Sequence, residues 1–246
     1  MHERTRILVG ETGLAKLAAA RVLVAGLGGV GGACAEALCR AGIGHLDLLD
    51  HDTFAASNLN RQLLATREVL GRLKAEVAAE RLRSIRPDIS LAVHGTFLAP
   101  PDADGLVAGE RFDHVADCID SVACKAALVL ACQRRAVPVM SSLGAGGRLD
   151  VRQVQVGQLA EVSGCGLGRA LRKRVRAEGG SLTLPVVYST ETPVPPLPHA
   201  PVSSPDAPGR PRATNGTISY LPNLFGMMVA GEIIRQILDR EVPRSS

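Results

Sequence analysis

The sequence predicts an α/β fold: a doubly wound, mostly parallel sheet with helices on both faces. Two observations carry this prediction. Through the first half of the chain, short β-branched and aliphatic runs alternate with longer segments of helical periodicity. A glycine-rich turn stands directly between the first such run and the first helical segment. This alternation is typical of strand–helix–strand units, which place parallel strands in one sheet.

The predicted strands of the first half are short and rich in aliphatic residues. They are expected at residues 21–25, 46–50, 91–93, 114–117 and 137–142. The intervening helices are expected at residues 33–41, 74–85 and 122–135. Gly42 marks the end of the first helix, and Pro87 follows the end of the second.

The second half has a different pattern. It predicts one more strand at residues 151–156, a short basic helix at 167–178 and an amphipathic helix at 224–238. Residues 192–212 contain eight of the 15 prolines and cannot form a regular element, so we expect a long crossover or mobile loop at 192–213. We expect one domain over residues 1–246, with a nucleotide-binding core at 1–156 and a substrate-facing part at 157–246.

The composition is that of a globular protein. Of the 246 residues, 46% are hydrophobic and 21% charged, with a formal net charge of +4. Only 2% are aromatic, which argues against RNA-binding modules built from several stacking residues. The six cysteines include no CxxC pair, which argues against a zinc site of paired knuckles. The start of the chain lacks a signal-peptide pattern, and we expect a cytoplasmic protein.

The glycine turn has the form of a nucleotide-binding loop. Gly26 permits a tight turn, Gly28 and Gly29 let a phosphate approach the backbone, and Gly31 lets the helix pack on the strand. The helix N-terminus then offers free N–H groups to an anion. Asp50, at the end of the next predicted strand, stands where a carboxylate can bind ribose hydroxyls. These features predict a Rossmann-like nucleotide site.

Further charged residues favour ATP with a metal over a dinucleotide. Arg61 and Lys74 can neutralise a triphosphate, and Asp120, after a predicted strand, can hold Mg²⁺ beside it. Hydride transfer needs none of them. Taken singly, they also fit a surface charge, a Lys–Glu helix face and a helix cap, so the prediction depends on their combination.

Four motifs in this order resemble the ubiquitin-activating E1-like superfamily, the ThiF/MoeB/HesA group: GLGGVG, LLDHDTFAASNLNRQ, GRLKAE and DCIDS. Later segments are similar to its tRNA threonylcarbamoyladenosine dehydratase branch (TcdA, or CsdL): GAGGRLD, LRKRV and YSTE. The resemblance implies Mg-ATP-dependent adenylation of a carboxylate. In this branch the carboxylate belongs to N6-threonylcarbamoyladenosine (t6A) in tRNA, and the product is its cyclic form. A homodimer and a sulfurtransferase or cysteine desulfurase partner are further implications.

The resemblance also assigns roles to individual residues. The phosphate-contacting positions are polar or basic: Asn58, Arg61, Gln62 and Lys74. The ribose ligand is Asp50, and the metal ligand is Asp120. An N-terminal arginine of such dimers reaches into the partner's site, for which Arg4 is the nearest match and Arg6 competes.

A basic cluster on the helix at 167–178 predicts a polynucleotide partner. It places five positive charges within eight residues: Arg169, Arg172, Lys173, Arg174 and Arg176. A solvated helix face is the alternative, and the resemblance to the tRNA-acting branch favours RNA. Cys165 lies in a glycine-rich segment before this helix, and we interpret it as a bystander.

Three other functions remain open at this point. The first is an activator of a ubiquitin-like or sulfur-carrier protein, which adenylates a C-terminal glycine. The second is a non-catalytic scaffold of a sulfur relay that has kept the nucleotide fold. An NAD-dependent oxidoreductase is the third, and it does not explain the triphosphate-neutralising residues.

Overall fold

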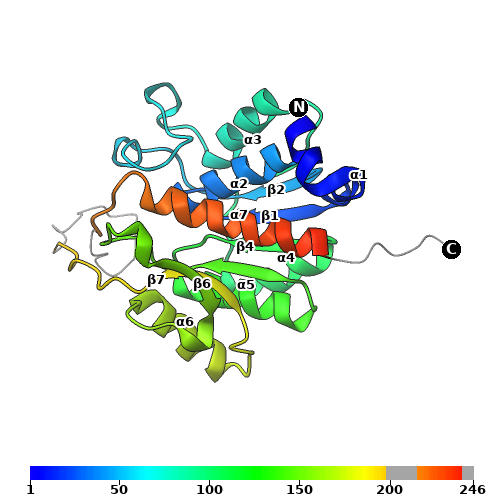
Figure 1. Cartoon of the computed structure of the whole chain (residues 1–246). Coiled ribbons are helices and arrows are strands. Elements are labelled where there is room, and N and C mark those ends of the chain that lie inside the picture. The colour runs from blue at the N-terminus through cyan, green and yellow to red at the C-terminus, as the bar shows by residue number, and fades with distance from the viewer. Residues whose placement is uncertain (198–214, 240–246) are drawn as a thin grey trace.

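A computed structural model describes residues 1–197 and 215–239 of the chain. The strands form one seven-stranded sheet in the order β3-β2-β1-β4-β5-β7-β6 (Figure 1). Their bounds are β1 Arg21–Ala25, β2 His45–Leu49, β3 Ser90–His94, β4 His114–Asp117, β5 Val139–Ser142, β6 Val154–Gln158 and β7 Pro185–Ser189. Neighbouring strands are parallel except β6 and β7, which are antiparallel. The predicted doubly wound, mostly parallel sheet is confirmed.

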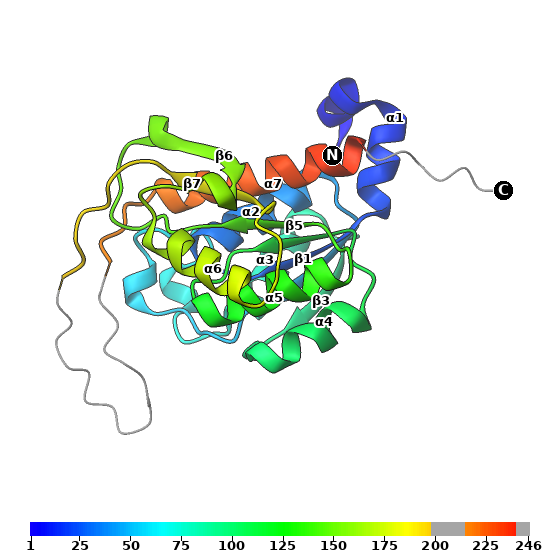
Figure 2. The same ribbon diagram turned by 90° about the horizontal axis from the view of Figure 1, so that it is seen from below.

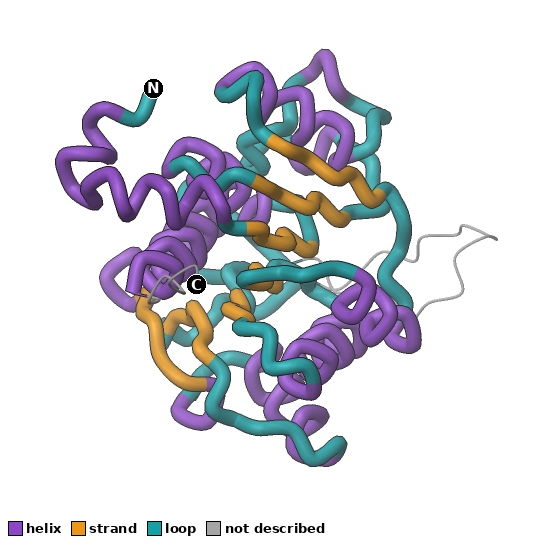
Figure 3. Tube along the Cα trace, turned by 90° about the vertical axis from the view of Figure 1, so that its right-hand side faces the viewer, coloured by secondary structure: helices purple, strands orange, loops and turns teal. Residues whose placement is uncertain are grey.

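Helices cover both faces of this sheet (Figures 2 and 3). Their bounds are α1 Glu3–Ala19, α2 Gly29–Ala41, α3 Lys74–Ile85, α4 Ala103–Gly109, α5 Val122–Arg134, α6 Gly166–Ala177 and α7 Leu221–Asp239. Short 3₁₀ turns lie at Ala56–Asn58, Arg67–Val69, Pro100–Asp102, Val151–Gln153 and Leu159–Glu161. No helix in residues 1–197 or 215–239 is long and apolar enough to cross a membrane.

The sheet separates two hydrophobic cores. Val22 and Val24 of β1 face a core shared with α2, α3, α7 and the end of α1. Leu23 and Ala25 face the other core, with α4, α5 and α6. Side chains of a strand alternate between faces, so a stretch of strand buried on both sides is apolar throughout, as residues 22–25 of β1 are. This double burial holds the carboxyl ends of the central strands in fixed positions.

Helices α2 and α7 pack most closely in the first core. A Cβ on Gly226 would lie 2.2 Å from the carbonyl oxygen of Val30, so only glycine allows this approach. The start of α7 therefore lies against the start of α2. In Figure 1, α7 crosses the sheet beside α2.

The predicted elements are largely present, with specific differences. Strands β1 and β4 and helix α3 have the predicted bounds, whereas α2 begins at residue 29, within the glycine motif, rather than at 33. The strand expected at 151–156 is a 3₁₀ turn followed by β6 at 154–158. Helices α1 and α4 and strand β7 were not predicted. Most of the segment interpreted as a mobile loop, 192–213, lies outside the described residues.

Candidate nucleotide-binding site

The glycine loop lies at the carboxyl end of β1. The chain continues from β1 to β2 and β3 on one side of this strand, and β4 and β5 lie on its other side, so the strand order reverses next to β1. Ligands of open α/β sheets bind at such switch points. Gly26 has a φ of +87°, and a Cβ there would lie 2.8 Å from the carbonyl oxygen of Cys118. A Cβ on Gly31 would lie 1.7 Å from the carbonyl oxygen of Gly26. Both positions require glycine, and the N-terminus of α2 is left facing the crevice beyond the sheet.

Asp50 is held directly against this loop. Its carboxylate accepts hydrogen bonds from the backbone N–H of Leu27 at 2.6 Å and of Asp52 at 2.8 Å. The residue is 9% exposed. The predicted ribose ligand thus lies at the expected strand end, oriented by two backbone donors.

The segment after β2 brings Arg61 and Gln62 over the start of α2. A Cβ on Gly28 would lie 3.7 Å from Gln62 Nε2, and one on Gly29 would lie 3.7 Å from Arg61 Cγ. Gln62 is buried, and its Oε1 has no hydrogen-bond partner among the described residues. A buried amide oxygen without a partner is costly, and a bound ligand can satisfy it.

Asn58 and Arg61 also stabilise their own turn. Asn58 Oδ1 accepts from the backbone N–H of Ala55 at 3.0 Å. The Arg61 guanidinium donates to the carbonyl oxygen of Ser57 at 2.8 Å and to Asn60 Oδ1 at 2.9 Å. Asn58 and Arg61, two of the four residues predicted to contact phosphate, therefore have local hydrogen bonds in this structure.

Lys74, at the start of α3, is buried, and its ammonium donates to Asp52 Oδ2 at 2.9 Å. Asp52 in turn donates its backbone N–H to Asp50, so a continuous chain of contacts joins Lys74 to the glycine loop. Asp120 is exposed just beyond β4, two residues after Cys118, whose carbonyl oxygen would lie 2.8 Å from a Cβ on Gly26. The structure thus gathers the predicted nucleotide residues other than Arg4 at one edge of the sheet.

A buried ion pair lies beside Asp120 and was not predicted. Lys125 and Asp117 are both inaccessible to solvent, and their charged groups are 2.8 Å apart. The Lys125 ammonium also donates to Ser141 Oγ at 3.1 Å and to the carbonyl oxygen of Ser142 at 2.9 Å. Ser141 Oγ donates to Asp117 at 2.6 Å. These bonds tie the carboxyl ends of β4 and β5 together.

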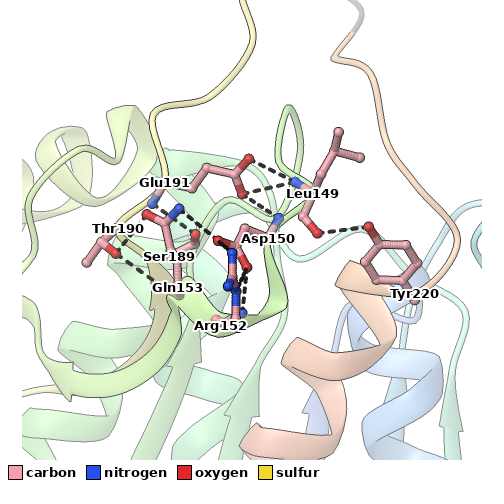
Figure 4. Close-up of polar contacts among 8 residues, drawn as sticks. All are labelled: Leu149, Asp150, Arg152, Gln153, Ser189, Thr190, Glu191 and Tyr220. Carbon is pink, nitrogen blue, oxygen red and sulfur yellow. Dashed lines mark hydrogen bonds and ion pairs between the residues drawn. The ribbon is translucent and has the colours of Figure 1, made fainter.

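The loop after β5 is fixed by Arg148 and Glu191. The buried Arg148 guanidinium donates to four carbonyl oxygens: those of Gly144, Gly146, Gly164 and Glu191. The Glu191 carboxylate accepts from the backbone N–H groups of Leu149, at 3.0 Å, and Asp150, at 2.8 Å (Figure 4). Hydrogen bonds from Arg152 lower the pKa of Asp150 to about 2, so this carboxylate is ionised at neutral pH.

Residues 215–223 connect this loop to the nucleotide site. The Tyr220 hydroxyl donates to the carbonyl oxygen of Leu149 at 2.8 Å. Asn223 Nδ2 donates to the carbonyl oxygen of Arg61 at 3.1 Å, and Asn60 donates to that of Thr217 at 2.9 Å. No sequence pattern predicts these hydrogen bonds, because their partners are far apart along the chain.

The five cations of α6 do not share one environment. Arg172 donates to the carbonyl oxygens of Leu159, Ala160 and Val162, and Arg174 pairs with Glu178 at 3.2 Å. The other three are exposed and have no ion-pair partner within residues 1–197 and 215–239: Arg169, Lys173 and Arg176. Together with Arg172 they line a cavity of about 330 Å³.

Arg4 is not part of the gathered site. It is exposed on α1, which leads into the amino end of β1, whereas the glycine loop follows the carboxyl end. Arg6 pairs with Glu11 at 3.1 Å. An arginine on α1 is therefore far from its own chain's glycine loop.

Two thiols near the site, those of Cys34 and Cys165, are buried. Cys165 is buried, and its Sγ accepts from the backbone N–H of Gly168 at 3.4 Å. A hydrogen bond to Cys118 and burial raise the pKa of Cys34, so this thiol stays neutral. Neither Cys165 nor Cys34 has the exposure of a reactive thiolate.

Comparisons with known proteins agree with this geometry. The model of the ThiF family matches residues 2–246. The Escherichia coli tRNA threonylcarbamoyladenosine dehydratase is 40% identical over 195 residues, which cover 76% of this chain and 72% of the relative. The solved structure of E. coli TcdA in complex with ATP has a TM-score of 0.84 and 34% identity, over 96% of this chain and 92% of that one. The E. coli molybdopterin-synthase adenylyltransferase is 39% identical over 130 residues, 53% of this chain and 51% of the relative.

Proposed function

The chain belongs to the ThiF family, and we propose that it acts as an ATP-dependent tRNA threonylcarbamoyladenosine dehydratase in the cytoplasm. The observation that carries the proposal is the convergence of the glycine loop, Asp50, Arg61, Lys74 and Asp120 at one edge of the sheet. Similarity to a dehydratase over most of the chain, and to an ATP-bound structure, supports it.

In this proposal the glycine amides and the N-terminus of α2 bind the phosphates, and Asp50 binds the ribose. Arg61 and Lys74 offset charge on the transferring and leaving groups, with Asn58 and Gln62 beside them. Phosphate oxygens only accept, so Gln62 would contact them through Nε2, which faces Gly28, and its unpartnered Oε1 would accept from a hydroxyl or amino group of the ligand. Catalysis is then mainly positioning and electrostatics.

Asp120 fits a magnesium ligand. Its carboxylate is exposed at the carboxyl end of β4, and carboxylate and phosphate oxygens are the ligands that Mg²⁺ prefers. When bound there, Mg²⁺ would neutralise phosphate charge. The buried Lys125–Asp117 pair fixes the strand end from which Asp120 extends.

The chemistry needs no enzyme nucleophile. The t6A carboxylate attacks the α-phosphorus of ATP and pyrophosphate leaves. A nitrogen of the same modified base then attacks the acyl-adenylate and expels AMP, which closes the ring. Because this attack is intramolecular, holding the base still is sufficient.

Activation of a sulfur-carrier protein is the second candidate. The molybdopterin-synthase adenylyltransferase matches about half of this chain, whereas the dehydratase matches about three quarters. The deciding experiment is mass spectrometry of nucleosides from t6A-bearing tRNA incubated with the protein and Mg-ATP. A product lighter by one water supports the dehydratase. Adenylation of a protein ending in Gly-Gly, without that product, supports the alternative, and ATP binding without pyrophosphate release supports a scaffold.

The proposed roles of Lys74 and Asp120 are testable separately. Lys74→Ala and Asp120→Ala should each abolish ATP-dependent pyrophosphate release while leaving the circular dichroism spectrum unchanged. Arg83→Ala, which removes an exposed cation from the same helix as Lys74, is the matched control and should retain the activity. Retained release in either site variant would remove that residue from the mechanism.

We further propose that α6 binds tRNA phosphates through its three exposed, unpaired cations: Arg169, Lys173 and Arg176. Replacing all three with alanine should weaken RNA binding. The slope of the logarithm of the binding constant against the logarithm of the salt concentration should become shallower by roughly 0.7–0.9 for each phosphate that the variant no longer neutralises. Arg174→Ala, whose side chain pairs with Glu178, is the control and should have a smaller effect. An unchanged slope in the triple variant would exclude α6 as the RNA-binding element.

The resemblance to the family is the ground for proposing a dimer and a protein partner. We propose a homodimer in which Arg4 or Arg6 reaches the partner's site, because α1 lies far from its own glycine loop. Sedimentation of the intact protein measures the dimer. A pull-down with a sulfurtransferase or cysteine desulfurase tests that partner.

A further inference from the structure

We propose that Tyr220 is a base-stacking residue, whose ring receives an unpaired base of the RNA substrate beside the ATP site. This inference rests on the proposed function, and it names Tyr220 as the residue that contacts the unpaired base of the RNA. Three observations support it. The ring is exposed, its hydroxyl is hydrogen-bonded, and the residue lies between the nucleotide loop and the loop after β5.

The two tyrosines of the chain differ sharply in exposure. Tyr188 is 7% exposed within β7, whereas Tyr220 is 44% exposed just before α7. The Tyr220 hydroxyl donates to the carbonyl oxygen of Leu149 at 2.8 Å (Figure 4). The bond fixes one end of the side chain and leaves much of the ring in solvent. A held, exposed aromatic ring loses little conformational entropy when a base stacks on it.

The acceptor of this tether is itself held in place. Glu191 accepts from the backbone N–H groups of Leu149 and Asp150, and Arg148 donates to the Glu191 carbonyl oxygen. The position of the ring therefore depends on a fixed loop rather than on a free side-chain rotamer. Leu149 adds an apolar side chain that is itself exposed, at 57%.

On its other side, the Tyr220 segment forms a wall of the proposed ATP site. Asn223 donates to the carbonyl oxygen of Arg61 at 3.1 Å. A Cβ on Gly29, in the glycine loop, would lie 2.9 Å from Pro222 Cβ. Tyr220 thus stands two residues from a side chain that packs against the phosphate loop. A carboxylate on a base must reach the α-phosphate, so the base has to lie beside that loop.

Single-stranded RNA loops are recognised by proteins that stack unpaired bases on aromatic side chains. Such stacking is sequence-tolerant and changes affinity by roughly five- to hundredfold per base. The low aromatic content of this chain argues against a platform of several rings, and it is compatible with one stacking ring. Within the described residues, the exposed tyrosine and phenylalanine side chains are Tyr220 and Phe97, and the Phe97 ring already packs edge-on against His51 at 4.9 Å between centroids.

Tyrosine fluorescence reports the event directly, because the chain has no Trp and only two Tyr. The probe is an anticodon stem-loop RNA that carries t6A, and it is also used in a fluorescein-labelled form for anisotropy. We expect the RNA to quench the emission of the wild-type protein. In Tyr220→Phe, where only the buried Tyr188 emits, the quench should disappear while affinity stays within about threefold, because the ring remains.

Tyr220→Leu keeps apolar bulk but removes the ring. It should lower RNA affinity about five- to hundredfold and leave ATP affinity, measured by calorimetry, unchanged. RNA that binds without quenching, or equal affinity in Tyr220→Leu, overturns the stacking role and leaves the dehydratase proposal intact. A sedimentation coefficient that falls in Tyr220→Leu assigns the ring to an interface between copies instead. If the labelled RNA binds none of the proteins, the proposed function itself fails.

Discussion

Gly226→Ala tests how the packing of α2 on α7 supports the nucleotide site. The added Cβ would lie 2.2 Å from the Val30 carbonyl oxygen and 2.9 Å from Ala33 Cβ. Real Cβ atoms essentially never approach a neighbour within 3.0 Å, so the helices must separate. The helix gains about 1 kcal/mol from replacing Gly by Ala. Overpacking costs about 1–3 kcal/mol, and we expect the upper end because a helical carbonyl cannot rotate away. The net loss of stability is about 2 kcal/mol.

Urea denaturation measures this loss, and calorimetry measures the ATP affinity. Affinity should also fall, because Pro222 and Asn223 at the start of α7 touch Gly29 and the Arg61 carbonyl. Gly231→Ala, in the same helix with no atom within 4 Å of the added Cβ, is the control and should gain about 1 kcal/mol. A Gly226→Ala protein as stable as Gly231→Ala would refute the reasoning.

Three further outcomes follow from single positions. Ala136, just after α5, has a φ of +52°, so Ala136→Gly should raise the free energy of unfolding in urea by about 0.5–1 kcal/mol, and a lower value would contradict this. Lys125→Met leaves Asp117 buried without its cation and should cost about 3–5 kcal/mol; adding Asp117→Asn should recover part of the loss in the same assay. Gly147 has a φ of +73°, and its Cβ would lie 2.9 Å from the Val194 carbonyl oxygen. Gly147→Ala should therefore slow formation of the cyclic nucleoside more than it weakens ATP binding, and an equal loss in both assays would contradict this.

The sequence predicts the nucleotide half of the site because its signals are local. The glycine loop, the strand before it and the acid at the end of the next strand lie in one continuous segment. Doubly buried stretches of strand, such as residues 22–25 of β1, are continuous apolar runs, which a short window detects. Helix α1 was missed because it has no buried stripe at its start: Ile7 and Leu8 are exposed, and Gly10 interrupts the helix with a φ of +69°.

The other half of the site depends on hydrogen bonds between distant segments. Tyr220 and Leu149 are 71 residues apart, and Asn223 and Arg61 are 162 apart. No periodicity or motif links such positions. The basic helix α6 also could not be fully interpreted from the sequence. Counting its charges does not distinguish Arg172, which donates to backbone carbonyl oxygens, from the cations that remain exposed.

One short segment serves both halves of the proposed site. Residues 215–223 contact the Arg61 carbonyl on the nucleotide side and the Leu149 carbonyl on the side of Glu191. Because one segment makes both contacts, a change at the Arg61 carbonyl on ATP binding would also bear on Tyr220, and a base stacked on Tyr220 would bear on the wall of the ATP site. Any such coupling must be reciprocal, since each ligand changes the affinity of the other by the same factor. The geometry thus suits a reaction whose two substrates must be held together before the carboxylate is activated.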